Sequence, residues 1–362
     1  MRILLIIDGL PGGGAEKVVL TLAEGFLRQG AQVSLFSLRD VCHYDLPAGL
    51  NYQVISDNDR SPWRKITELS RRAKQLDRAV RAAGEFDLIL SNLHKTDRIV
   101  SLSKVLPKEK VWFCLHGMFS SSYLGHRTGF SRWLKQRKIK KVYNKRNIVA
   151  VSEAVAKDIT EQFALKPANY RVIYNPFDIE AILDAANAPC DLAGHAYIVH
   201  VGRLHETKRH DRLIEAYAQS QINAPLVLLG QGKEALTEKL KALAQKLGVE
   251  DKVIFKGFQA NPYPYIKHAS LLVLSSDSEG FGNVLVESLI CGTPIVSTAC
   301  PGGPVEILQK MGMENALAEL DSHSLGQKMA EVYQHPPIVN KERLGIYQLD
   351  YICKKYIALI DA

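Results

Sequence analysis

The chain lacks two features that would place it in a membrane or outside the cell. No run approaches the roughly 20 consecutive apolar residues that a spanning helix needs, although 46% of the 362 residues are hydrophobic. The six cysteines form no C-x-x-C pair, and several lie within apolar runs such as VWFCLHG. Because scattered, buried thiols are typical of reducing compartments, we predict a cytoplasmic protein.

Signals for two further classes are also missing. The first residues, MRILLIIDGLPGGG, contain an apolar run but no small-residue cleavage site, which favours a buried first strand over a signal peptide. No helix-turn-helix, zinc-finger or RNP pattern occurs, so we expect no nucleic-acid partner despite the net charge of +8.

Charge is divided unevenly along a chain that is long enough for two domains. Residues 1–175 contain 29 basic and 16 acidic residues, a balance of +13. Residues 176–362 contain 17 basic and 22 acidic residues, a balance of −5. Two parts of opposite charge indicate two different tasks.

Apolar runs of strand length alternate with helical patterns in both halves, which predicts an α/β protein with two Rossmann-like, doubly wound domains. We place their junction near Asn175-Pro176. The runs are bounded by polar or glycine turns, as buried strands of parallel sheets are; they are ILLII, AQVSLFSL, FDLILSN, KVWFCLH, NIVAVS, AYIVHVGR, APLVLLG, KVIFKGF, SLLVLSS and TPIVST. Ligands of such sheets lie beyond the carboxyl ends of the strands, so motifs directly after strands are the candidates for a site.

The first candidate is the glycine loop DGLPGGGAEK (8–17), between the first strand and the first helix. Adjacent glycines such as Gly13 and Gly14 let the backbone approach a ligand closely, and amides at a helix start favour an anion. The loop is not a P-loop, and Lys17 stands where a dinucleotide fingerprint has its third glycine. A tight structural turn and a ligand-contacting loop are both compatible with this pattern.

Two cations follow a strand in VHVGRLHETKRHDRLIEA (199–216). Arg203 comes immediately after the strand, and Lys208 lies at the start of the next helix. A guanidinium offers a planar fork of donors and an ammonium offers a point charge, so together they suit a diphosphate. Taken alone, they could equally be solvated charges at the surface.

Two acids flank a glycine turn in SEGFGNVLVESLICGTPIVST (278–298). Glu279 precedes the turn, and Glu287 lies one turn into a helix that starts near Asn283. A carboxylate can accept hydrogen bonds from two vicinal hydroxyls, as in ribose recognition, and the amides of 280–283 suit phosphate or sugar oxygens. One acid for each sugar, with amides between them, predicts a nucleotide-sugar site.

The pattern E-G-F-G-x-x-x-x-E, preceded by V-G-R-L-x-x-x-K-R-x-D-R-L-I, closely resembles retaining glycosyltransferases of the GT-B fold, family GT4. The resemblance extends over nearly the whole chain. It implies an acceptor-binding domain at 1–175 and a donor-binding domain at 176–340, facing each other across a cleft. It also implies that a C-terminal helix within 341–362 crosses back to pack on the first domain.

The resemblance assigns roles to individual residues. Arg203 and Lys208 would bind the donor diphosphate, Glu287 the ribose, and Glu279 the hydroxyls of the transferred sugar. Backbone near Phe258 would hold the base. The full donor-contacting set that it implies is Gly13, Gly14, Arg203, Lys208, Phe258, Glu279, Gly280, Phe281, Gly282, Asn283, Val284 and Glu287.

His116 follows the strand KVWFC and could be an ordinary, satisfied polar residue. A family histidine at this place contacts the donor sugar near its anomeric centre, so the resemblance implies a catalytic set of His116, Glu279, Arg203 and Lys208. The chain offers no triad and no carboxylate pair at glycosidase spacing. The front-face route proposed for the family needs neither, because the diphosphate leaves and the acceptor hydroxyl attacks the face just vacated.

We expect neither a metal nor another cofactor beyond the donor, a UDP-sugar or GDP-sugar. Asp57-Asn58-Asp59 imitates the D-x-D motif that chelates a metal in a different glycosyltransferase fold. It lies between a short strand and a helix that starts near Trp63, which favours a role in a turn or an N-cap.

Two segments carry the positive charge of the first half. Residues 60–81 contain eight basic and two acidic residues, and residues 127–146 contain nine basic and no acidic residue. The apolar residues of the second segment form no single helical stripe, which disfavours a simple amphipathic anchor. Family members often act on lipid-linked or lipopolysaccharide acceptors, so the resemblance implies peripheral contact with anionic lipid at the cytoplasmic face of the inner membrane. A solvated helix face is the alternative.

The sequence therefore predicts transfer of a hexosyl or N-acetylhexosaminyl unit from a nucleotide-sugar, with UDP favoured, to a saccharide or glycolipid such as a lipopolysaccharide core. A GDP-mannose-dependent mannosyltransferase and a sugar-nucleotide 2-epimerase are the enzymatic alternatives. A non-catalytic sugar-nucleotide sensor is the third. The transferred sugar, the acceptor and the linkage are not determined by the sequence.

Overall fold

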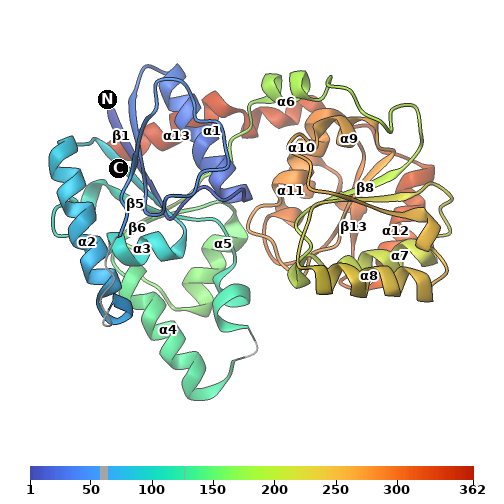
Figure 1. Cartoon of the computed structure of the whole chain (residues 1–362), viewed down its shortest axis with the longest axis horizontal. Coiled ribbons are helices and arrows are strands. Elements are labelled where there is room, and N and C mark those ends of the chain that lie inside the picture. The colour runs from blue at the N-terminus through green and yellow to red at the C-terminus, as the bar shows by residue number, and fades with distance from the viewer. Residues whose placement is uncertain (58–63, 126) are drawn as a thin grey trace. The chain divides into compact units, whose positions relative to one another are not determined.

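A computed structural model describes residues 1–57, 64–125 and 127–362, apart from the side chains of 64–66. The chain divides into two compact units (Figure 1). The first comprises Met1–Pro176 and Tyr347–Ala362, and the second comprises Phe177–Ile346. Tyr347–Ala362 is the segment that returns to the first unit, while Arg343, just before it, donates a hydrogen bond to the carbonyl of Lys310 within the second unit.

In the described part of the first unit, seven parallel strands form a sheet in the order β3-β2-β1-β4-β5-β6-β7. Central strand β1 is apolar and buried along nearly its whole length, and β4 is buried throughout, as strands covered by helices on both faces must be. The strands are β1 Arg2–Ile7, β2 Gln32–Ser37, β3 Asn51–Val54, β4 Leu88–Asn92, β5 Val111–Leu115, β6 Asn147–Ala150 and β7 Asn169–Val172. The α-helices are α1 Gly14–Arg28, α2 Arg64–Ala83, α3 His94–Val100, α4 Gly129–Tyr143, α5 Glu153–Lys157 and α13 Leu349–Ile357.

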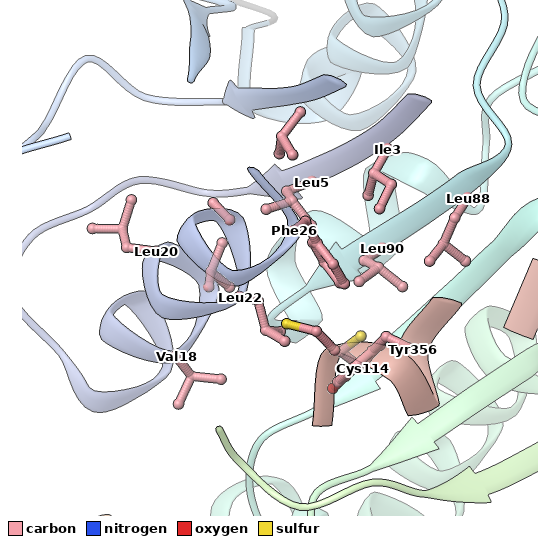
Figure 2. Close-up of a cluster of buried hydrophobic side chains, with 14 of the residues drawn as sticks. Ile3, Leu5, Val18, Leu20, Leu22, Phe26, Leu88, Leu90, Cys114 and Tyr356 are labelled. Carbon is pink, nitrogen blue, oxygen red and sulfur yellow. The ribbon is translucent and has the colours of Figure 1, made fainter. Parts of the chain in front are cut away.

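The last helix, α13, completes the core of the first unit, which confirms the predicted return of the chain. Leu349, Ile352, Cys353 and Tyr356 join the cluster formed by β1, β4 and α1 (Figure 2). Phe26 and Tyr356 meet edge to face with ring centroids 6.2 Å apart. Close packing depends on Gly25, because a Cβ there would lie 2.5 Å from the Cys353 sulfur.

In the second unit, six parallel strands form a sheet in the order β10-β9-β8-β11-β12-β13 over the described residues. The strands are β8 Ile198–Val201, β9 Leu226–Leu229, β10 Val253–Gly257, β11 Leu271–Leu274, β12 Ile295–Thr298 and β13 Leu317–Ala318. The α-helices are α6 Ile179–Ala185, α7 His210–Ser220, α8 Glu234–Lys246, α9 Tyr263–His268, α10 Asn283–Cys291, α11 Gly303–Met311 and α12 Ser322–Gln334. Gly248 takes the left-handed conformation just after α8, at φ +66°, as predicted for the end of that helix.

The strand order places a switch point between β8 and β11. The chain leaves β8 toward β9 on one side of the sheet and later returns to β11 on the other side. Loops after such neighbouring strands diverge and leave a crevice at the carboxyl edge, where α/β proteins bind ligands. The predicted fold class, two doubly wound α/β domains, is therefore confirmed. Within the described ranges, no helix has both the length and the apolar character needed to cross a bilayer.

Candidate functional site

The β8–β11 switch point brings Lys208 and Glu279 together. Lys208 ends a short 3₁₀ turn, Glu206–Lys208, in the loop between β8 and α7, so it lies just before the helix in which the sequence places it. Its ammonium donates a 2.6 Å hydrogen bond to Glu279 Oε1, and the hydroxyl of Ser276 donates to the same oxygen. Both charged side chains are mostly buried, 25% exposed for Lys208 and 12% for Glu279.

The two loops that carry this pair are fastened to each other. The Ser275 hydroxyl donates to the carbonyl of Lys208 at 2.8 Å, and the amide of Asp277 donates to the carbonyl of Thr207 at 2.9 Å. Buried Arg212 donates to both the carbonyl of Ser275 and the carboxylate of Asp277. The position of Glu279 relative to Lys208 is thus held by hydrogen bonds from both loops.

Glu287 lies on α10, one turn beyond the glycine turn, as predicted. Its side chain is buried and accepts a hydrogen bond from the hydroxyl of Tyr263, on α9, at 3.2 Å. A buried carboxylate needs such partners, because an uncompensated charge in the interior is costly. Tyr263 and Asp277 are site residues that the sequence analysis missed, since neither belongs to a recognisable motif.

The loop before α11 packs directly against the loop of Glu279. Gly302 has φ +129°, and a Cβ built there would lie 1.7 Å from the carbonyl oxygen of Glu279. A Cβ on Gly303 would lie 2.2 Å from the carbonyl oxygen of Phe281. The Phe281 side chain is itself buried against Phe177, with ring centroids 6.2 Å apart, so in this structure its ring belongs to the interior.

Arg203 and Phe258 lie at the same carboxyl edge, after β8 and β10. Both side chains are exposed, 61% in the case of Phe258. The turn after β9 packs tightly against the turn after β8, because a Cβ on Gly230 would lie 1.9 Å from the carbonyl oxygen of Gly202. The predicted roles of both residues, like those of Gly280, Gly282, Asn283 and Val284 in the glycine turn, stay predictions.

In the first unit, His116 follows β5 and has a defined partner. Its Nε2 lies 2.9 Å from Asn92 Oδ1, while Asn92 Nδ2 donates to the carbonyls of Ile6 and Leu90. With the amide in this orientation, Nε2 carries the ring proton. Burial lowers the pKa of His116 to about 4, so the ring is neutral at pH 7, and Nδ1 has no hydrogen-bond partner among the described residues. Its predicted contact with the donor sugar stays a prediction.

The glycine loop of the first unit has a local structural explanation as well as its predicted ligand role. Gly14 begins α1, and a Cβ on Gly13 would lie 2.3 Å from the carboxylate of Glu16. The carbonyl of Gly13 also accepts a hydrogen bond from the hydroxyl of Tyr44. The two interpretations of the loop therefore both stand.

The D-x-D-like segment is only partly visible, since Asn58 and Asp59 lie outside the described residues. The carboxylate of Asp57 accepts hydrogen bonds from Arg71 and Gln75 on α2. Within the described ranges, no group of three or more His, Cys, Asp or Glu side chains is arranged to hold a metal ion. The expected independence from metal stays a prediction.

We expect the protein to lose stability as the pH falls from about 6.5 toward 5. Burial lowers the pKa of His200 to about 4 and that of His210 to about 2, and their rings meet 4.6 Å apart beside the Lys208 loop. The unfolded chain binds protons near pH 6.5 and the folded chain does not, so each ring costs roughly 1.4 kcal/mol of unfolding free energy per pH unit below that value. Urea unfolding at several pH values measures the slope.

Replacing one of the two histidines tests whether they cause this pH dependence of stability. In His210→Leu the slope should become shallower, because neither ring nitrogen has a hydrogen-bond partner among the described residues and only the ionisable group is removed. His195→Leu is the matched control, since His195 is exposed. An unchanged slope in His210→Leu would contradict the assignment.

Comparison with known proteins identifies the relatives of the chain. Residues 12–181 match the family model described as "Glycosyltransferase Family 4", and residues 192–346 match the model "Glycosyl transferases group 1". Over 305 residues the chain is 29% identical to a Campylobacter jejuni protein named as a diphospho-undecaprenol-linked saccharide 4-alpha-N-acetylgalactosaminyltransferase, with 84% of this chain and 82% of the relative covered. It is 38% identical to the Rhizobium meliloti lipopolysaccharide core biosynthesis glycosyltransferase LpsE over 133 residues, 36% of this chain and 38% of the relative.

The fold has solved counterparts. The Anabaena protein HepE, in a crystal structure with UDP-glucose, superposes with a TM-score of 0.76 at 21% identity, covering 100% of this chain and 99% of HepE. At that identity the likeness shows the fold alone. With family models matched on both units and glycosyltransferases among the relatives, the chain belongs to the family 4 glycosyltransferases of the GT-B fold and is an enzyme.

Proposed function

We propose that this enzyme is a retaining glycosyltransferase that moves a hexosyl or N-acetylhexosaminyl unit from a nucleotide-sugar to a lipid-linked or lipopolysaccharide saccharide. The observation that carries the proposal is the Lys208–Glu279 pair at the β8–β11 switch point. A cation and an acid held together there provide one group for a phosphate and one for sugar hydroxyls. Glu287, on the helix that follows, is the proposed ribose ligand.

The paired geometry indicates how the donor would be accommodated. A lysine ammonium has three donor protons, and Glu279 takes one of them. Lys208 can therefore keep this contact and still donate to a diphosphate oxygen. Arg203, exposed at the end of β8, would add a second cation to the same group. As the bond from sugar to phosphate breaks, negative charge grows on the diphosphate, and fixed cations stabilise that transition state more than the ground state.

The front-face route is also a proposal. The acceptor hydroxyl would attack the face from which the diphosphate has just departed, and a departing phosphate oxygen would take its proton. The alpha linkage in the name of the Campylobacter jejuni relative supports retention, because common UDP-hexose donors are themselves α-linked. Arg203 and Lys208 supply positive charge at the leaving group, and the proposal therefore assigns no metal to this step.

Support for the substrates comes from related proteins. The HepE structure was determined with UDP-glucose, which supports a UDP-sugar as donor. The Campylobacter jejuni relative is named for a diphospho-undecaprenol-linked acceptor, and the Rhizobium meliloti relative for the lipopolysaccharide core. These names support a glycolipid acceptor and, with it, peripheral action at the cytoplasmic face of the inner membrane.

A ligand screen tests the proposal directly. UDP- and GDP-sugars should raise the melting temperature of the purified protein, because a ligand at 100 times its Kd adds about 2.7 kcal/mol to the stability of the state that binds it. The UDP series should give the larger shift. Assays of nucleoside diphosphate release with and without a glycolipid acceptor then separate a transferase from an epimerase or a sensor. Absence of a shift with every UDP- and GDP-sugar would contradict the donor assignment.

A further inference from the structure

Helix α4 lies on the outside of the first unit (Figure 1), and its first half carries an exposed aromatic pair. Phe130 is 74% exposed and Trp133 49%, and their rings stack with centroids 5.5 Å apart. Leu134, 39% exposed, lies beside them. Residues spaced i, i+3 and i+4 share one face of a helix, so these three form a single outer apolar patch.

The opposite face of α4 is fixed to the unit. Ile139, Val142 and Tyr143 are buried, and the Tyr143 hydroxyl donates to Asp97 at 2.7 Å. The segment therefore contains two apolar sets, one inside and one outside. This is why its sequence shows no single stripe, and the outer set can be considered apart from the inner one.

Along the outer face of α4, the apolar patch is followed by basic side chains. Arg137, Lys138 and Lys141, which follow Phe130 by seven, eight and eleven positions, are exposed on the same face. The Arg137 guanidinium lies 5.4 Å from the centre of the Trp133 ring. No acidic residue occurs anywhere in 127–146, so this face has charge of one sign.

We propose that the outer face of α4 inserts into the interface of an anionic lipid bilayer. Phe130, Trp133 and Leu134 would lie at the boundary between headgroups and acyl chains, and the three cations of the next turns would contact lipid phosphates. Aromatic and leucine side chains beside Lys and Arg are the composition of interfacial helices. The inference deepens the proposed function by naming the surface that faces a lipid-linked acceptor, and it rests on that function for the choice of a membrane.

A bilayer fits this surface better than a nucleic-acid strand. Strand-binding grooves need aromatic rings that are free on one face for successive bases. Here the two rings stack on each other, Arg137 lies over Trp133, and aliphatic Leu134 completes the patch. The other basic segment is a weaker candidate, because Arg71 and Arg72 on α2 are paired with Asp57 and Glu68, and residues 60–63 lie outside the described ranges.

The fluorescence of Trp133 can report whether this face inserts into a bilayer. The chain has three tryptophans; Trp112 is fully buried, and Trp63 is removed in a Trp63→Phe background. Mixed phosphatidylglycerol–phosphatidylcholine vesicles should shift Trp133 emission to the blue, and brominated acyl chains should quench it. Vesicles of phosphatidylcholine alone should bind the protein at least about tenfold more weakly, and added salt should weaken binding to the anionic vesicles only in part, because apolar insertion is not screened.

Matched variants separate the contribution of apolar insertion from that of electrostatic attraction. Phe130→Ser/Trp133→Ser, followed by vesicle sedimentation because it lacks the fluorescent probe, should have a partition coefficient at least about tenfold lower. The binding that remains should be abolished by salt. Ile338→Ser, at a position 95% exposed in the second unit, should change nothing. Unquenched Trp133, equal binding by the serine variant, preferred binding to RNA, or a concentration-dependent dimer lost in that variant would each overturn the proposal. Nucleotide-sugar binding by the serine variant reports separately on the proposed function.

Discussion

Lys208→Ala should reduce the rate of nucleoside diphosphate release by about 100-fold or more, the usual cost of removing one group that stabilises transition-state charge. Lys208 is the proposed contact between the enzyme and the leaving diphosphate. The side chain of Lys208 is hydrogen-bonded to Glu279, and its carbonyl, which accepts from the Ser275 hydroxyl, is retained in the variant, so the sheet beneath should remain intact. The rate is measured with whichever UDP- or GDP-sugar gives the largest thermal shift.

The variant also leaves Glu279 without its cation. A carboxylate that is only 12% exposed and unpaired costs stability, so Lys208→Ala should unfold at a lower urea concentration. Adding Glu279→Gln should restore much of that stability, which would show that the loss comes from the uncompensated Glu279 charge. Lys241→Ala is the control, because Lys241 forms an exposed ion pair with Glu238 elsewhere in the unit. Near-normal turnover in Lys208→Ala would remove this lysine from the mechanism.

Gly302→Ala should destabilise the second unit by about 3 kcal/mol or more, because steric conflict with backbone cannot be relieved by rotating a side chain. The added methyl would lie 1.7 Å from the carbonyl oxygen of Glu279, at a position with φ +129°. Either the loop of Glu279 moves or the helix start at α11 does. In both cases the pairing of Glu279 with Lys208 is disturbed, so the thermal shift produced by UDP should also disappear.

The matched control is Gly248→Ala. Gly248 has φ +66°, but among the described residues no heavy atom beyond its own chain neighbours lies within 4 Å of the position its Cβ would take. Its substitution should therefore cost only the roughly 1–2 kcal/mol of a left-handed backbone, and UDP should still stabilise the variant. If the two variants lost equal stability and both kept the response to UDP, the close contact with the loop of Glu279 would be unimportant.

Much of the fold could be predicted because its signals are local. Buried parallel strands have continuous apolar runs and helices have a 3.6-residue period, so SLLVLSS and the region after Asn283 identified β11 and α10 directly. The end of α8 at Gly248 could be predicted for the same reason. The glycosyltransferase family was identifiable from two motifs, each of which follows a strand. Contacts between motifs depend on strand order, which no local pattern encodes.

The tertiary structure decided the rest of the candidate site. The hydrogen bond from Tyr263 to Glu287 and that from Arg212 to Asp277 join residues 24 and 65 positions apart, without any spacing rule that connects them. Phe281 looks like an exposed turn residue in the sequence, but its ring packs on Phe177 in the interior. The two apolar sets of α4 could be told apart only when the helix was seen against its sheet.

By itself, the sequence determined the class of fold, the family, the carboxyl edge of the sheets as the place of the candidate site and the uneven division of charge. Composition, periodicity and motif spacing are properties of neighbouring residues, and these features follow from them. Only the tertiary structure decided which charges meet, which glycines have no room for a Cβ and which apolar residues of α4 face solvent. These depend on the order of strands in the sheets and on packing between segments far apart in the chain.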